Sequence, residues 1–295
     1  MQKYSVFNLI KNAFSGHQNW EVAWKDPTPK KSYDVIIIGG GGHGLATAYY
    51  LAKEHNITNV AIIEKGWIGG GNVGRNTTII RSNFMHDANG RFNEFSMDLW
   101  RNMSQELNFN VMFSPRGIIN LAHSDAQMNA YARRGNSMRL NGIDAVLLNR
   151  EEVKKIIPMA DFSDDVRFPI FGGLMQPSAG TARHDAVAWG YARQADSMGV
   201  DIIQNCEVLG FDVVGGKIKG IRTSRGDIKV KKIGLCVAGS TNILAEKLNM
   251  TLPIETHLLQ ACVSEPVTPV LDRVVTFGAG HFYMSQSDKG EMVMG

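Results

Sequence analysis

The composition is that of a folded globular protein. The chain has 295 residues, of which 44% are hydrophobic and 20% are charged, so it is long enough for one large or two ordinary domains. The formal net charge is +3, from 31 Lys and Arg against 28 Asp and Glu. No long block of one sign stands out, and nucleic acid is therefore not an expected partner.

The N-terminal residues are not continuously apolar. Residues 6–7 and 9–10 are apolar, but Asn8 separates them and Lys11 follows. A signal peptide or a membrane span needs an unbroken apolar stretch, so we expect a cytoplasmic protein with no membrane association. An amphipathic transit peptide is the alternative for this end of the chain.

Residues 1–32 form an N-terminal arm. At its end, Pro27 and Pro29 disfavour a helix and predict an extended segment that leads into the fold. The arm carries Phe7, Trp20 and Trp24. These large aromatic side chains indicate that the arm packs on another surface.

The spacing of the cysteines and histidines does not indicate a metal site. Three cysteines lie far apart and predict buried thiols in a reducing compartment, and three histidines lack the spacing of metal ligands. These residues are Cys206, Cys236, Cys262, His123, His257 and His281.

A β-α-β pattern begins at residue 34. Residues 35–38 are an all-apolar run typical of a strand buried on both faces, and they lead into a glycine cluster at residues 39–44. Residues 45–53 have helical spacing, and residues 59–63 predict a second buried strand. This order indicates a parallel sheet.

Later segments predict a more mixed architecture. Helices are expected at residues 92–107 and 185–198, and strands at residues 200–203, 208–214, 217–223 and 228–237. A hairpin is expected at residues 282–285 and 291–294, directly before the last residue. We therefore expect the chain to be a fragment of a longer protein.

The glycine cluster fits G-x-G-x-x-G between a strand and a helix. Gly39 permits the tight turn, Gly41 lets the backbone approach a pyrophosphate, and Gly44 allows close packing of helix on strand. Glu64, at the end of the second strand, is placed to accept hydrogen bonds from a ribose 2′-hydroxyl. NAD and FAD both satisfy this unit.

A second glycine-rich segment favours FAD. Residues 69–81 supply flexible backbone, hydroxyls, Arg75 and Arg81. The segment resembles FAD-dependent amine oxidoreductases of the D-amino acid oxidase and glycine oxidase class, in which such a stretch lies against the pyrophosphate and flavin. The resemblance implies non-covalent FAD held by Gly39, Gly41, Gly42, His43, Gly44, Glu64, Lys65, Asn72, Arg75, Asn76, Thr77, Ile79, Val208, Ala238 and Gly239.

Longer stretches resemble the beta subunits of heterotetrameric sarcosine oxidases. They are residues 33–53, 64–83, 113–117, 176–189 and 289–295. The resemblance implies oxidative demethylation of sarcosine. FAD takes a hydride equivalent, covalent FMN passes the electrons to oxygen to give hydrogen peroxide, and the one-carbon unit leaves as formaldehyde or passes to tetrahydrofolate.

The fold class expected from this resemblance is α/β, or α+β overall. After the arm, a discontinuous Rossmann-like FAD-binding domain comprises residues 33–87 and 178–254. A substrate and interface domain with a mainly antiparallel sheet comprises residues 88–177 and 255–295.

The same resemblance assigns roles outside the FAD loops. His184 takes the position of the histidine that binds FMN covalently, and Arg183 is placed to hold its phosphate. From the residues alone, a single histidine before a helix is more often a surface residue, and Asp185 caps the helix that follows. Arg81 is the candidate for the substrate carboxylate, and Tyr283 matches a gating tyrosine, although simple packing explains it as well.

Partners and alternatives follow from the same comparison. Alpha, gamma and delta subunits are expected, with the NAD and tetrahydrofolate sites on a partner subunit. Members of the family continue into a C-terminal portion with a flavin-contacting loop and a lysine, both absent from this sequence. A dehydrogenase for dimethylglycine or another secondary amine is an alternative, as is a cofactor-binding subunit without activity of its own.

Overall fold

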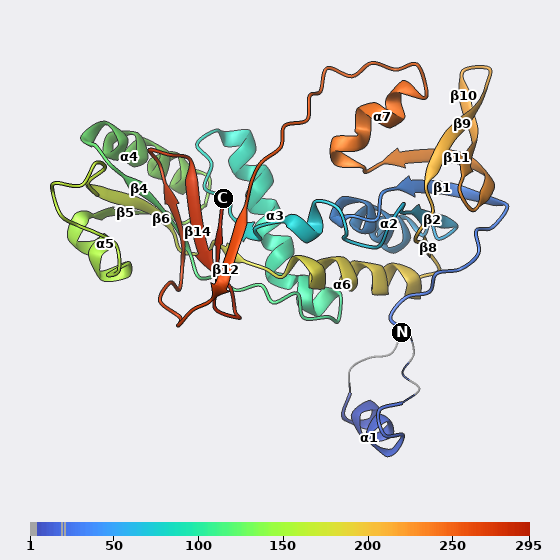
Figure 1. The fold of residues 1–295 in the computed structure, drawn as a ribbon, viewed down its shortest axis with the longest axis horizontal. Coiled ribbons are helices and arrows are strands. Elements are labelled where there is room, and N and C mark those ends of the chain that lie inside the picture. The colour runs from blue at the N-terminus through green and yellow to red at the C-terminus, as the bar shows by residue number, and fades with distance from the viewer. Residues whose placement is uncertain (1–4, 19, 21) are drawn as a thin grey trace. The chain divides into compact units, whose positions relative to one another are not determined.

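The computed structural model describes residues 5–18, 20 and 22–295. The chain divides into two compact units, each made of three segments (Figure 1). Unit 1 comprises Met1–Asn76, Gln105–Val111 and His184–His257. Unit 2 comprises Thr77–Ser104, Met112–Arg183 and Leu258–Gly295.

The division differs from the expected domain boundaries at four places. Residues 105–111 and 255–257, which we assigned to the substrate domain, lie in unit 1. Residues 77–87 and 178–183, which we assigned to the nucleotide-binding domain, lie in unit 2. Both segments pair there, because β3 (Ile79–Ile80) forms a small antiparallel sheet with β7 (Gly180–Thr181).

Unit 1 alternates strands and helices before it ends in a strand meander. Its elements are α1 (Val6–Phe14), β1 (Ser32–Ile38), α2 (Gly42–His55), β2 (Val60–Ile63), η1 (Val73–Arg75), α6 (His184–Ser197), β8 (Asp201–Ile203), β9 (Val208–Val214), β10 (Lys217–Thr223), β11 (Gly226–Leu235), η2 (Ala238–Ser240) and α7 (Thr241–Glu246).

The six strands of unit 1 form one sheet in the order β8-β2-β1-β11-β10-β9. The neighbours β8, β2, β1 and β11 are parallel, whereas β10 is antiparallel to both β11 and β9. All four residues of β2 are buried, as expected for a strand inside a parallel sheet. The Rossmann-like half of the fold prediction is confirmed.

Helices α2 and α6 meet through aromatic rings. The ring centroids of Tyr49 and Tyr191 lie 5.4 Å apart, and the Tyr49 hydroxyl donates to Glu106 over 2.9 Å. Lys53 forms an ion pair with the same carboxylate at 2.8 Å. The ring contact holds α6 against α2, and the two contacts with Glu106 hold the end of α3 (Asp87–Glu106) against α2.

Unit 2 is built around a larger sheet. Its elements are β3 and β7, α3 (Asp87–Glu106, with its last two residues in unit 1), β4 (Ile118–Ala122), α4 (Asp125–Leu140), β5 (Val146–Asn149), α5 (Arg150–Ile156), β6 (Gly172–Gln176), β12 (Cys262–Pro266), β13 (Val274–Phe277), β14 (Phe282–Gln286) and β15 (Glu291–Met294).

Seven strands of unit 2 form a sheet in the order β12-β15-β14-β13-β4-β6-β5. Every neighbouring pair is antiparallel except β13 and β4. One face packs Ile119 and Leu121 with Val153 of α5 in an apolar cluster. The other face packs Leu174 against Met138 of α4, so each face has its own helix.

The N-terminal arm contains a helix that was not predicted. Residues 6–14 are helical because Ser5 caps the first turn, its side chain accepting a hydrogen bond from the Asn8 N–H. Prolines at positions 27 and 29 cannot disfavour a helix so far upstream. Phe7 and Trp20 are 79% and 53% exposed in this single chain, so the contact predicted for the arm stays a prediction.

The thiol prediction is wrong in part. Cys206 is buried, Cys236 is partly buried and Cys262 is exposed. Cys262 is exposed because it belongs to β12, the edge strand of the unit 2 sheet. Within the described residues, no helix combines the length and apolarity that crossing a membrane requires.

The junction of β1 and α2 leaves no room for a side chain at Gly44. A Cβ there would lie 2.0 Å from the Gly39 carbonyl oxygen and 3.3 Å from the side chain of Ile37. We expect Gly44→Ala to lower the free energy of unfolding by about 1–3 kcal/mol or more, because backbone must move to relieve the clash. Chemical denaturation measures the change.

The matched control is Gly71→Ala in the second glycine-rich segment. A Cβ at Gly71 would meet nothing within 4 Å, so stability should stay within about 0.5 kcal/mol of the parent protein. Equal stability of the two variants would contradict the close packing of α2 on β1.

Candidate functional site

The glycine loop lies where parallel strands end together. Because β1, β2 and β11 are parallel, their carboxyl ends share one edge of the unit 1 sheet. The loop 39–44 follows β1, Glu64 follows β2, and Ala238 with Gly239 follow β11. Ligands of open α/β sheets bind at this edge.

The loop presents an uncapped helix N-terminus. Gly39 has φ +111°, and a Cβ there would lie 2.3 Å from the Cys236 carbonyl oxygen. Gly41 precedes α2 in extended conformation and provides no side-chain cap. The first N–H groups of this 14-residue helix, which include those of Gly42 and His43, therefore suit an anion such as a pyrophosphate.

Glu64 holds the loop through both carboxylate oxygens. Oε2 accepts from the Gly40 N–H over 2.7 Å, and Oε1 accepts from the Gly66 N–H over 2.8 Å. A carboxylate has about four acceptor positions, so two hydrogen bonds leave capacity for ribose hydroxyls. The neighbouring Lys65 is exposed.

The second glycine-rich segment is tied to the first. The Gly69 N–H donates to the Gly40 carbonyl over 3.0 Å, which brings the two loops together. Arg75 Nη1 donates to the carbonyls of Gly70 and Gly71, at 2.6 and 2.9 Å. Arg75 and its neighbours Asn72 and Asn76 are exposed.

Two later strands reach the same edge. The Cys206 N–H donates to the Glu64 carbonyl over 2.9 Å, and β9 begins two residues later at the buried Val208. Ala238 has the left-handed φ of +46°, and both it and Gly239 are exposed. Unit 1 thus gathers the residues expected to hold the nucleotide part of FAD.

The remaining residues of the expected FAD set, Thr77 and Ile79, lie in unit 2. Ile79 belongs to β3 and pairs with Thr181 of β7. Thr78 between them has φ +67°, a left-handed conformation that is strained for a β-branched residue.

His184 is the first residue of α6 and belongs to unit 1. Its Nδ1 atom is buried and makes no hydrogen bond. Asp185 accepts from the Ala186 N–H over 2.7 Å, so its side chain serves the first turn of the helix. Arg183 belongs to unit 2.

Arg81 follows β3 and is partly buried. Its Nη1 donates to Asn83 Oδ1 over 2.6 Å, and its guanidinium lies over the Phe84 ring, 4.6 Å from the centroid. Burial lowers the pKa of Arg81. Among the described residues, no carboxylate pairs with it, so its charge is available to an anion.

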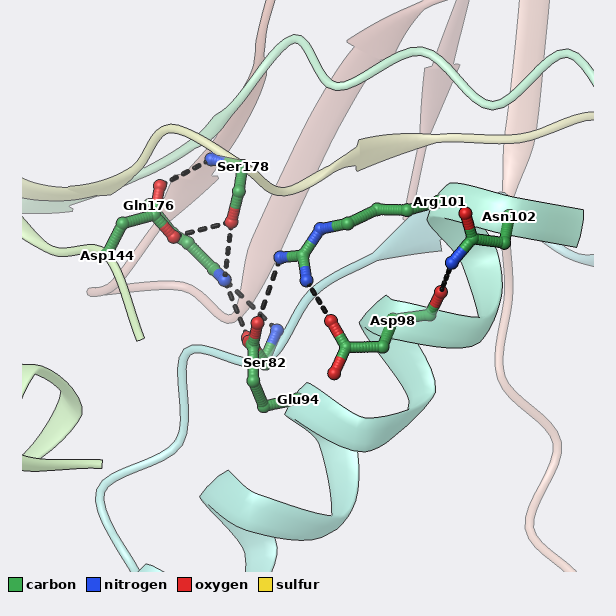
Figure 2. Close-up of polar contacts among 8 residues, drawn as sticks. All are labelled: Ser82, Glu94, Asp98, Arg101, Asn102, Asp144, Gln176 and Ser178. Atoms are coloured by element: carbon green, nitrogen blue, oxygen red, sulfur yellow. Dashed lines mark hydrogen bonds and ion pairs between the residues drawn. The ribbon is translucent and has the colours of Figure 1, made fainter. Parts of the chain in front are cut away.

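The residue after Arg81 is fixed by a buried polar network. Ser82 is fully buried; its N–H donates to Gln176 Oε1 over 3.0 Å, and its hydroxyl donates to Glu94 over 2.6 Å. Figure 2 shows this network continuing from Glu94 to Arg101, and from Gln176 through Ser178 to Asp144. Buried networks whose groups are satisfied are rigid.

Asn83 connects Arg81 to the sheet. Its Nδ2 donates to Asn120 Oδ1 over 2.8 Å, and Asn120 in turn donates to Thr276. Thr276 is opposite both Asn120 and Tyr283 in the strand register. Side chains of directly opposite residues lie on the same face of a sheet. Tyr283, Thr276 and Asn120 therefore form one row on one face, and Asn120 is the residue that binds Asn83.

The polar residues that support Arg81 were not predicted from the sequence. They are Asn83, Asn120, Arg134, Gln176 and Thr276. The available signal was a polar residue inside an apolar strand, as at positions 120 and 176, but such a residue does not identify its partner. No group of three or more His, Cys, Asp or Glu side chains in the described part of the chain could hold a metal ion.

Comparison with known proteins agrees with this geometry. Residues 34–295 match the family model described as FAD dependent oxidoreductase. The chain is 60% identical to the sarcosine oxidase subunit beta of Rhizobium meliloti (strain 1021), over 99% of this chain and 70% of the relative. It is 51% identical to the sarcosine oxidase subunit beta of Rhodobacter capsulatus, over 100% of this chain and 71% of that relative.

A solved structure shows the same fold. The L-proline dehydrogenase from P. horikoshii superposes with a TM-score of 0.80 and 27% identity, over 90% of this chain and 70% of that chain. The mixed α/β prediction is confirmed. The chain is therefore an oxidoreductase subunit that belongs to the FAD-dependent oxidoreductases and, among these, to the family of sarcosine oxidase beta subunits.

Proposed function

We propose that the complex containing this chain converts sarcosine to glycine by flavin-dependent oxidative demethylation. The observation that carries this proposal is Arg81, a partly buried cation fixed by Asn83 and without an acidic partner in the described residues. The 60% identity to a sarcosine oxidase beta subunit supports the choice of substrate.

Unit 1 fits non-covalent FAD. The uncapped N-terminus of α2 suits the pyrophosphate, Glu64 keeps acceptor capacity for ribose, and Gly39 permits the tight turn beside the Cys236 carbonyl. FAD, when bound, supplies the acceptor for the hydride equivalent that leaves the N-methyl carbon. In this proposal the unit 1 residues predicted for FAD hold its nucleotide part.

Unit 2 binds the substrate. The Arg81 guanidinium offers a planar two-point contact to the carboxylate of sarcosine, and its partial burial strengthens that pairing relative to water. Asn83, Ser82 and Gln176 already hold the loop in place. The loop therefore loses little conformational entropy when the substrate binds. Tyr283, on the face that carries Asn120, is the residue we assign to control of access.

His184 is the residue we assign to covalent FMN. Its buried Nδ1 without a hydrogen bond fits a ring held ready for a further bond, and Arg183 supplies a cation for the phosphate. If FMN is held at His184, it would supply the site at which oxygen is reduced to hydrogen peroxide. The one-carbon unit leaves as formaldehyde or passes to tetrahydrofolate.

The name subunit beta of the relatives supports a multi-subunit complex. We propose alpha, gamma and delta subunits as its other members, with NAD and tetrahydrofolate bound on a partner subunit.

The substrate is tested by anaerobic mixing of the complete complex with sarcosine. We expect the visible absorbance of the oxidised flavin to bleach, because the substrate reduces it and oxygen is absent. Dimethylglycine is the comparison. Bleaching by dimethylglycine alone would support the alternative dehydrogenase, and bleaching by neither would support a subunit without this chemistry.

Substitution of the carboxylate-binding residue should mainly weaken binding. We expect Arg81→Ala to raise the apparent Kd for sarcosine by roughly tenfold to a hundredfold, since a charge-assisted hydrogen bond contributes about 1.5–3 kcal/mol. Stopped-flow flavin reduction measures it. Arg91→Ala, which removes an exposed arginine paired with Asp87, is the control and should bind normally. Unchanged affinity in Arg81→Ala would remove Arg81 from the site.

The covalent flavin is tested by acid precipitation of the purified complex. We expect yellow colour to remain with the protein and to be lost in His184→Asn, because the amide cannot replace the imidazole. His257→Asn is the control, since that side chain is 81% exposed. Release of all flavin from the parent protein into the supernatant would disprove the attachment.

A further inference from the structure

A second arginine reaches the loop that holds Arg81. Arg134 lies on α4 and is partly buried. Its Nε donates to the backbone carbonyl of Asn83 over 2.7 Å, and its Nη2 donates to the same oxygen. Nη1 makes no hydrogen bond within the described residues, so part of the guanidinium is left to bind another group.

Two guanidinium groups therefore converge on Asn83. Arg81 binds its side-chain oxygen, and Arg134 binds its backbone oxygen. Burial lowers the pKa of both arginines, and the charge of Arg81 lowers the pKa of Arg134 further. In the part of the chain that the structure describes, neither arginine has a carboxylate partner. Two like charges in partly buried surroundings are stabilised when an anion lies near both.

A purely structural role does not account for a charge at this position. Helix α4 also holds the loop through Ser137, whose hydroxyl donates to the Met85 carbonyl over 2.6 Å. A neutral donor is thus sufficient to bind a carbonyl in this segment. A guanidinium adds positive potential beside Arg81, which a loop anchor does not require.

We propose that Arg134 is a positioning residue of the carboxylate site: it fixes Asn83, and through it Arg81, while its charge favours binding of the substrate as an anion. This inference rests on the proposed role of Arg81. It predicts that the site selects N-methyl amino acids with a free carboxylate over their neutral amides.

The experiment uses the complete flavin-containing complex with Arg134→Gln, Arg134→Lys and the control Arg133→Gln. Arg133 is the adjacent residue on α4 and is exposed, so its substitution makes the same change of net charge away from the loop. Sarcosine and its neutral amide, N-methylglycinamide, are the two substrates. Anaerobic stopped-flow reduction gives the apparent Kd and the limiting rate for each.

We expect Arg134→Gln to raise the Kd for sarcosine roughly tenfold, equivalent to about 1.4 kcal/mol, with a smaller change in the limiting rate. The Kd for N-methylglycinamide should change much less, because its neutral carboxamide offers Arg134 no negative charge to attract. Arg134→Lys should recover part of the affinity, and Arg133→Gln should behave as the parent protein. An equal loss for both substrates, or no loss for sarcosine, would overturn the proposal.

Acetate separates this inference from the proposed function. Its binding to the oxidised complex, measured by calorimetry, reports the anion site without any turnover. If sarcosine does not reduce the flavin but acetate binding still depends on Arg134, the proposed function fails and the anion site stands. If sarcosine reduces the flavin but Arg134→Gln binds acetate as the parent does, only the role of Arg134 fails.

A double-mutant cycle of Arg81→Lys and Arg134→Gln tests whether the two arginines act together. Because they share Asn83 and the same anion, their effects on the Kd for sarcosine should be non-additive. Additive effects would show that Arg134 acts independently of Arg81 and would contradict the positioning role.

Discussion

The loop between β3 and α3 is buried at its centre, and the polar groups there must find partners inside the protein. Ser82 and Asn83 are both almost fully buried. Each buried polar group without a hydrogen-bond partner would lower the free energy of unfolding by about 1–3 kcal/mol. The partners of Ser82 and Asn83 come from β4, β6, α3 and α4, so this one requirement joins elements that are far apart in the chain.

The same network explains how a cation is kept in place. Arg81 stays partly buried because Asn83 accepts one of its hydrogen bonds and Phe84 covers its guanidinium plane. Glu94 lies nearby in sequence but is occupied by Ser82 and Arg101. The acids of the network are thus used for structure, and the positive charge of Arg81 is not neutralised.

The parts of the molecule that follow local rules were predictable. The glycine spacing and the apolar strands predicted β1, α2 and β2 because close backbone contacts admit only glycine at positions such as Gly44. Helix α1 was not predicted. Its start depends on a single capping residue, Ser5, whereas the prediction for the arm was based on the prolines near its end. Arg81 was proposed through a family resemblance. Arg134 was not found, because 51 residues separate it from Asn83 and no local pattern marks that contact.

The position of β1 in its sheet also has a consequence for biosynthesis. β1 pairs with β2 on one side, but on the other side with β11, so that Val35 is opposite Lys232. A ribosome therefore releases the first β-α-β segment long before its neighbouring strand exists. Until β11 emerges, one edge of β1 exposes unpaired backbone groups that can pair with another chain. During this interval the unpaired edge of β1 is a place at which the nascent chain can aggregate, and a chaperone that covers it would prevent this.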